Sequence, residues 1–285
     1  MSSTTPKPSK AERRDQAREQ ARQLREQQQK RERRSRILAI SGLSAAVIAL
    51  IVVIALILGN RPEPAAGVVY TGDDAETLTL ADVTAPSTTE SNGAIPVRAD
   101  GVAGEPAEDG DVVVLVYFDY MCPYCGKFEA ANDSELKTLR EAGGVTVEYH
   151  IISFLDGQSA GGQYSTRAAN ASAVVADGAP EAWSDFHSAL FESEPTEGTQ
   201  GLSDKELADI ATDAGVPQDV VDRFTVAADD GDWRIFAPWV VANTNTAATD
   251  LGKLSTPTVL IDGEQFTGDM YTAGPLTAAV EAAKG

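Results

Sequence analysis

The sequence predicts an α/β fold with an inserted helical domain, preceded by a single N-terminal transmembrane helix. Two patterns give the α/β part of this prediction. An apolar, β-branched run at Val112–Phe118, a helical pattern at Pro123–Ala142 and an alternating run at Val145–Ile152 form a β–α–β unit. Residues 157–252 are then mostly helical in pattern, and strand character returns at Pro257–Ile261. The helical block therefore interrupts the sheet-forming part of the chain.

The transmembrane helix is predicted at Ile37–Leu58, an apolar stretch without a formal charge. At about 1.5 Å per residue, this stretch is long enough to cross a hydrocarbon core of roughly 30 Å. It also exceeds the apolar region of about 7–15 residues that is typical of a cleaved signal peptide. We therefore predict an uncleaved signal anchor.

Charge is divided unevenly on the two sides of this anchor. Residues 1–36 carry 12 Lys/Arg and 5 Asp/Glu, whereas the remaining residues carry 11 Lys/Arg and 38 Asp/Glu. Basic flanks remain on the cytoplasmic side, so residues 1–36 are expected in the cytoplasm and the rest of the chain outside it. Such an acidic main region argues against nucleic-acid binding, because phosphates would repel it.

Residues 59–110 are predicted to be a linker followed by short strands. Two prolines interrupt the start of this region, and Thr77–Leu80 and Ile95–Arg98 have strand-like composition. The main domain is expected at residues 111–285, with the helical insertion at about residues 157–252.

Local signals place several elements within the main domain. Ser203 and Glu206 form a capping-box pattern at the start of a helix, and Pro217 is suited to open another helix. The pair Asp262-Gly263 predicts a hairpin turn after the Pro257–Ile261 strand. Pro275–Ala283 is expected to form a terminal helix.

The only two cysteines of the chain, Cys122 and Cys125, lie in a C-x-x-C motif between the first predicted strand and helix. Such a motif at a strand-to-helix junction is typical of a dithiol redox site. Unpaired N–H groups at a helix N-terminus favour a thiolate, which is the nucleophilic form. If Asp119 lay near the thiols, its negative charge would raise the pKa of Cys122 and disfavour the thiolate. We expect Asp119 instead to be an exposed acid at the end of the strand.

Two other interpretations of the cysteine pair are open. An inert structural disulfide is one, although a bridge that closes so short a loop constrains the unfolded chain little. The other is a zinc site made by Cys122, Cys125, His150 and His187. The two histidines fall on different predicted elements and lack the short spacing of typical zinc motifs. No metal and no organic cofactor is therefore expected.

The order of elements resembles a thioredoxin fold with a helical domain inserted in its middle. Residues 118–129, with the sequence Phe-Asp-Tyr-Met-Cys-Pro-Tyr-Cys-Gly-Lys-Phe-Glu, resemble the DsbA-like thiol–disulfide oxidoreductases. Residues 255–259, Ser-Thr-Pro-Thr-Val, are similar to the cis-proline loop of that family. The anchor and basic leader resemble membrane-tethered members from actinobacteria.

This resemblance implies roles for the two sulfurs and for the proline loop. Cys122 would be the nucleophile that forms a mixed disulfide, and Cys125 the resolving thiol. Pro257 would follow a cis peptide bond and expose the Thr256 backbone to an extended substrate. An ordinary trans proline at the start of a strand is the alternative.

Three further residues receive roles by the same resemblance. Pro123 and Tyr124 lie between the sulfurs and would tune their redox balance. Many DsbA proteins have His in place of Tyr124, and a tyrosine cannot supply that positive charge. Glu129 matches the acidic residue of the family near the buried cysteine and would relay its proton. A surface carboxylate is the alternative for Glu129.

The sequence thus predicts a membrane-anchored, extracytoplasmic thiol–disulfide oxidoreductase of DsbA type. Its expected partners are unfolded secreted proteins and a quinone-linked membrane protein, similar to DsbB or VKOR, that reoxidises the cysteines. The chain is expected to be a monomer. A reductase or isomerase of the same fold, and a non-catalytic peptide-binding or chaperone module, are the alternative functions.

Overall fold

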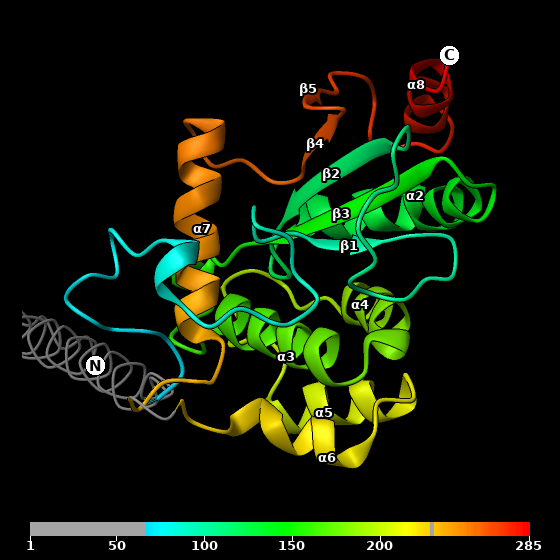
Figure 1. The fold of residues 1–285 in the computed structure, drawn as a ribbon. Coiled ribbons are helices and arrows are strands. Elements are labelled where there is room, and N and C mark those ends of the chain that lie inside the picture. Colours follow the sequence, from blue (N-terminus) through cyan, green and yellow to red (C-terminus); the bar gives the residue numbers. More distant parts are fainter. Residues whose placement is uncertain (1–66, 229–230) are drawn as a thin grey trace, which may run out of the picture. The chain divides into compact units, whose positions relative to one another are not determined.

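The structure is a computed structural model that describes residues 67–228 and 231–285 (Figure 1). The predicted cytoplasmic segment, the Ile37–Leu58 anchor and the start of the linker lie outside the described residues, so they stay predictions. Among the helices that are described, none has the length and apolar character needed to cross a membrane.

A five-stranded mixed sheet forms the centre of the domain, in the order β1-β3-β2-β4-β5. The central strand β2 pairs in parallel with β3, from Val112 opposite Val145 to Phe118 opposite Ile151. The other neighbouring strands pair antiparallel. The strands are β1 (Ile95–Val97), β2 (Val112–Phe118), β3 (Val145–Ile151), β4 (Thr258–Ile261) and β5 (Glu264–Gln265).

The two faces of β2 pack against different helices because its side chains alternate. Val114, Val116 and Phe118 belong to the main core, with the buried side of α2 (Pro123–Glu141) and with α8 (Pro275–Ala283). On the other face, Leu115 and Tyr117 join a second cluster that includes Ala247 and Leu251 of α7 (Ala237–Leu251). The sheet is therefore covered on both faces, as the continuously apolar β2 requires.

The helical insertion lies between β3 and β4, as the sequence predicts, and α3 to α6 lie below the sheet in Figure 1. Its capping box is present, since Ser203 accepts a hydrogen bond from the Glu206 backbone N–H. Pro217 caps the short helix that follows. The insertion contains α3 (Tyr164–Gly178), α4 (Trp183–Glu192), α5 (Asp204–Asp213), α6 (Gln218–Val221) and α7.

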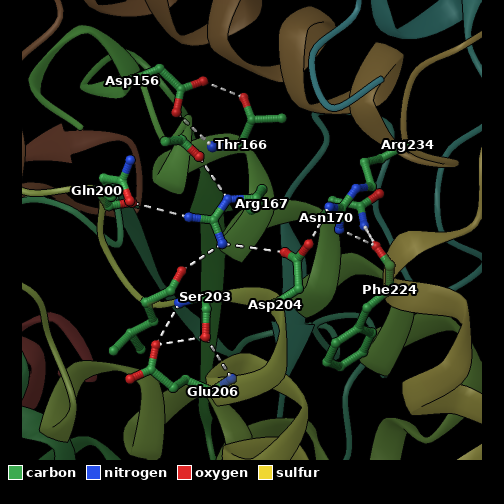
Figure 2. A network of polar contacts seen from close by, with 12 residues as sticks. Asp156, Thr166, Arg167, Asn170, Gln200, Ser203, Asp204, Glu206, Phe224 and Arg234 are labelled. Atoms are coloured by element: carbon green, nitrogen blue, oxygen red, sulfur yellow. Dashed lines mark hydrogen bonds and ion pairs between the residues drawn. The ribbon is translucent and has the colours of Figure 1, made fainter. Parts of the chain in front are cut away.

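Arg167 forms the centre of a polar network within this insertion (Figure 2). Its buried guanidinium donates hydrogen bonds to the carbonyl oxygens of Gly162, Gln200 and Leu202. It also lies 3.2 Å from Asp204, which forms a second ion pair of 2.7 Å with Arg234. This network fixes the loop between α4 and α5 to the loop that follows β3.

The predicted strand at Thr77–Leu80 is wrong. The chain instead forms a 3-10 turn at Leu80–Asp82, capped by Thr79. Asn245 of α7 donates hydrogen bonds from its side chain to the carbonyl oxygens of Ala75 and Leu78. Because a side chain satisfies these backbone groups, the segment needs no partner strand.

The hairpin prediction is confirmed. Asp262 and Gly263 have φ values of 48° and 83°, and they join the antiparallel strands β4 and β5. Asp262 also accepts a hydrogen bond of 2.8 Å from the Val113 N–H. The turn thus contacts the neighbouring β2, which helps to fix the register of β4.

Candidate active site

Both cysteines lie where β2 ends and α2 begins. Cys122 is the N-cap residue of α2, and Cys125 lies in its first turn. The N–H groups of Cys125 and Gly126 donate to the Cys122 carbonyl at 2.8 and 3.2 Å. Both thiols are unbridged and buried, with Cys122 4% and Cys125 2% exposed.

Asp119 holds the loop between β2 and the cysteines. It is fully buried, so the expectation of an exposed acid at the strand end is wrong. Its carboxylate accepts hydrogen bonds from the N–H groups of Met121 and Leu155, at 2.8 and 2.9 Å. Burial raises the pKa of Asp119 to about 7, although these hydrogen bonds act to lower it. Asp119 therefore connects the cysteine loop to the loop after β3.

The two thiols differ strongly in acidity. A hydrogen bond from the Cys125 side chain is the main cause that lowers the pKa of Cys122 to about 6. Burial opposes it, while Thr256 and the backbone N–H groups of Cys125 and Tyr124 lower the pKa further. Burial raises the pKa of Cys125 well above its usual range, and the Cys122 charge adds to this effect. Near neutral pH, Cys122 is therefore the thiolate and Cys125 the thiol.

This asymmetry predicts the pH dependence of alkylation. Because the thiolate is the reactive form and is favoured above its pKa, the rate of Cys122 alkylation by iodoacetamide should rise with a midpoint near pH 6. In Cys125→Ala the midpoint should move up toward the usual cysteine pKa of about 8.5, since the hydrogen-bond donor is lost. Cys125→Ser keeps a donor and should move it less. A wild-type midpoint near 8.5 would contradict the prediction.

The proline loop lies beside the cysteines, although it is far away in sequence. The antiparallel pairing of β2 with β4 places Thr258 opposite Tyr117, so the start of β4 meets the end of β2. The Thr256–Pro257 peptide bond is cis, as predicted. The carbonyl oxygen of Thr256 lies 3.5 Å from Cys122 Sγ.

Comparison with known proteins agrees with this geometry. The family model described as Thioredoxin matches residues 100–281, well over half of the chain. The chain belongs to the thioredoxin family. The reduced disulfide bond oxidoreductase DsbG from Mycobacterium tuberculosis has 28% identity and a TM-score of 0.53, with coverage of 67% of this chain and 88% of that one. The chain is thus similar in sequence and fold to DsbA-like thiol–disulfide oxidoreductases.

Two further proteins are similar to parts of this chain. MdbA, a thiol–disulfide oxidoreductase from Actinomyces oris, shares the fold, with 24% identity, a TM-score of 0.56, and coverage of 78% of this chain and 96% of that one. The serine/threonine-protein kinase PknE of M. tuberculosis is 35% identical over 120 residues, which is 41% of this chain. This chain spans only 21% of the length of that curated relative.

The residues between the cysteines have different environments in this thioredoxin-family site. Pro123 begins α2, where its missing N–H is tolerated. Tyr124 is 55% exposed, and its ring lies 4.8 Å from Lys127 Nζ and 5.9 Å from the ring of Tyr271. Tyr271 is also exposed. The sequence analysis predicted no role for Lys127 or Tyr271. Tyr271 is far from Tyr124 in the sequence, so no local pattern indicates that the two rings lie close together.

Glu129 is buried, so the alternative of a surface carboxylate is wrong. It lines a small buried pocket together with Cys125 and His187 of α4. His187 Nε2 lies 3.4 Å from Glu129 Oε1, and His187 Nδ1 lies 2.9 Å from the Tyr120 hydroxyl. From the sequence, His187 was considered only as a possible zinc ligand and not as a neighbour of Glu129. An ionisable pair from two separate helices therefore adjoins Cys125.

The four-residue zinc set considered from the sequence is not brought together. His150 is on β3 and bonds the Asn243 carbonyl of α7 at 3.0 Å, and its ring packs on Tyr117. That is the face of the sheet opposite the main core to which Cys125 belongs. The described residues contain no group of three or more His, Cys, Asp or Glu that could hold a metal ion.

Proposed function

We propose that this chain is a membrane-anchored, extracytoplasmic enzyme that forms disulfide bonds in secreted or cell-envelope proteins. The observation that carries the proposal is the position of Cys122 at the N-terminus of α2, 3.5 Å from the Thr256 carbonyl of the cis-proline loop, where a hydrogen bond from Cys125 lowers the pKa of Cys122 to about 6. A stabilised thiolate favours the reduced form of the enzyme, which makes its disulfide a stronger oxidant. Tyr124 cannot supply the charge that histidine supplies in many DsbA proteins, and in this chain a hydrogen bond from Cys125 lowers the pKa of Cys122.

The exchange would proceed through a mixed disulfide. A substrate thiolate attacks Cys122 in the enzyme disulfide, and Cys125 leaves and takes up a proton. A second substrate thiolate then attacks the substrate sulfur of the mixed disulfide, so that Cys122 leaves as a thiolate. The substrate has lost two electrons and gained a disulfide, and the enzyme has become a dithiol.

Exposed aromatic side chains next to the sulfurs support unfolded proteins as substrates. Tyr124 and Tyr271 are 55% and 43% exposed, and their rings lie 5.9 Å apart, so together they form an exposed aromatic pair. The Tyr271 ring thus lies close to Tyr124, which stands between the two cysteines in the sequence. Apolar segments of an unfolded chain would contact these rings while a thiol reaches Cys122.

Membrane attachment and reoxidation complete the proposal. The uncharged stretch Ile37–Leu58, with its basic flank, supports an anchor that leaves the sulfurs outside the cytoplasm. An enzyme that donates disulfides must be reoxidised, and a quinone-linked membrane protein of the DsbB or VKOR kind would meet the anchored domain at the membrane surface.

Glu129 is proposed to accept the proton of Cys125 when Cys125 attacks the mixed disulfide. Positioned proton acceptors typically contribute about 10²–10⁴-fold, so Glu129→Gln should slow resolution by about 100-fold or more. Rapid-mixing release of a fluorescent peptide from its mixed disulfide with Cys122 measures this rate. Asp133→Asn is the control, because Asp133 lies on α2 and faces the same Ser188 hydroxyl. An equal effect of both variants would contradict the role.

The direction of electron flow is tested by the reduction potential of Cys122 and Cys125 in the full-length chain, by equilibration with glutathione. A value near the roughly −120 mV of DsbA would support the proposal. A value near the roughly −270 mV of thioredoxin would overturn it in favour of a reductase.

A further inference from the structure

The carboxyl group of Glu194, which follows α4, lies against the first turn of α2. A Cβ atom added to Gly126 would come 2.2 Å from Glu194 Oε2, so the carboxyl occupies the space that this glycine leaves empty. Residues four apart on a helix share a face, and a helical Cβ points toward the N-terminus. The space at Gly126 therefore adjoins Cys122, whose carbonyl accepts the Gly126 N–H at 3.2 Å.

This is an unfavourable place for a negative charge. Glu194 Oε1 is buried and has no hydrogen-bond partner within the described part of the chain. An ionised oxygen in such a position loses its hydration without compensation. Burial is the main cause that raises the pKa of Glu194 to about 8, and the Cys122 charge is the second. Glu197 and Asp119 add to the shift, while Lys127 opposes it.

The loop that carries Glu194 is held firmly on its other side. The Gly198 N–H donates to the Gln158 carbonyl at 2.7 Å. Two residues further on, the Gln200 carbonyl accepts a hydrogen bond from the buried Arg167 (Figure 2). Glu194 thus lies between the end of α4 and this anchored loop.

We propose that Glu194 holds a proton while Cys122 is a thiolate and releases it when the enzyme disulfide forms. In exchange with a substrate dithiol, the substrate S–S bond forms and the Cys122–Cys125 bond breaks, so two electrons pass to the enzyme. The two substrate thiols release two protons. Cys125 takes one and Glu194 takes the other, while Cys122 stays a thiolate. The step runs equally in reverse, so it does not depend on the oxidase direction proposed above.

Glu194→Gln tests this coupling in the full-length chain. The equilibrium constant for reduction of the enzyme by glutathione is measured between pH 6 and 9. The ionisation of the glutathione thiol affects this constant equally in every variant, so it cancels when two variants are compared. One extra coupled proton makes this constant fall up to tenfold more per pH unit. The wild type should show part of this extra dependence just below pH 8, because the Cys122 charge is lost when the disulfide forms while the burial of Glu194 remains. Glu194→Gln should lose it. Equal slopes in the two proteins would overturn the proposal.

Glu192→Gln is the matched control, since it removes the same charge from an exposed site at the end of α4 and should keep the wild-type slope. Gly126→Ala gives a second, independent test. Its Cβ would displace the flexible end of Glu194, so the extra slope should disappear although the carboxyl is still present. Adding Glu194→Gln to Gly126→Ala should then change nothing. A further change in the double variant would contradict action from this position.

Discussion

Replacing Cys122 with Ser is expected to abolish thiol–disulfide exchange, whereas Cys125→Ser should yield an enzyme that remains bound to its substrates. Cys122 is the thiolate near neutral pH, and a serine hydroxyl does not replace it as a nucleophile in exchange. Without Cys125 the Cys122 thiolate can still attack a disulfide-bonded substrate, with one substrate sulfur leaving as a thiolate, but no enzyme thiol then resolves the mixed disulfide. Oxidation of a reduced two-cysteine peptide measures the first effect, and non-reducing electrophoresis detects the trapped species in the second.

The same pair of variants separates an enzyme from a binding module. If the chain only holds extended segments beside Thr256, then Cys122→Ser should bind an unfolded polypeptide and protect it from aggregation as well as the wild type does. Full biological activity of Cys122→Ser would favour the non-catalytic module and contradict the enzymatic proposal. Ser255→Ala is a suitable control, because it changes a hydroxyl in the proline loop and leaves both thiols in place.

Elements with strong local signals could be predicted from the sequence. Val112–Phe118 matches β2 at both ends, because a continuous β-branched run suits only a strand that is buried on both faces. The terminal helix Pro275–Ala283 also matches, since a proline at its first turn marks the start. The cis bond before Pro257 was predicted by resemblance, in a motif that is itself local.

What the sequence did not predict depends on contacts between distant segments. Glu129 is buried because α4 of the insertion packs on α2 and brings His187 to it, 58 positions along the chain. Asp119 is buried because the loop after β3 supplies the Leu155 N–H. The glycine at position 126 gives no local hint that Glu194 fills its empty side-chain space. Periodicity and motifs show which face of an element is apolar, but they do not identify the partner.

A large loss of stability is expected when Arg167 is replaced with Met. The methionine keeps the apolar part of the side chain, but it leaves the carbonyl oxygens of Gly162, Gln200 and Leu202 without their buried donor. A carbonyl that loses its donor without access to water costs about 1–3 kcal/mol. Gly162 and Leu202 are half-buried, while water reaches the exposed Gln200, so a loss of about 2–4 kcal/mol in the free energy of unfolding is expected. Urea unfolding followed by tryptophan fluorescence measures it, because Trp183 and Trp239 are fully buried.

Lys205→Met is the contrasting variant, since it removes an ion pair with Asp209 whose side chains are 81% and 59% exposed. Exposed pairs of this kind contribute about 0.5 kcal/mol, so the urea midpoint should hardly move. If both variants shifted the midpoint equally, the insertion would be held by its apolar core and not by the polar network. In that case the loop between α4 and α5 would be anchored without Arg167, and Glu194 would keep its place in the Arg167→Met chain. A selective loss in Arg167→Met would instead show that this buried guanidinium holds the loop between α4 and α5, which also carries Glu194, in place.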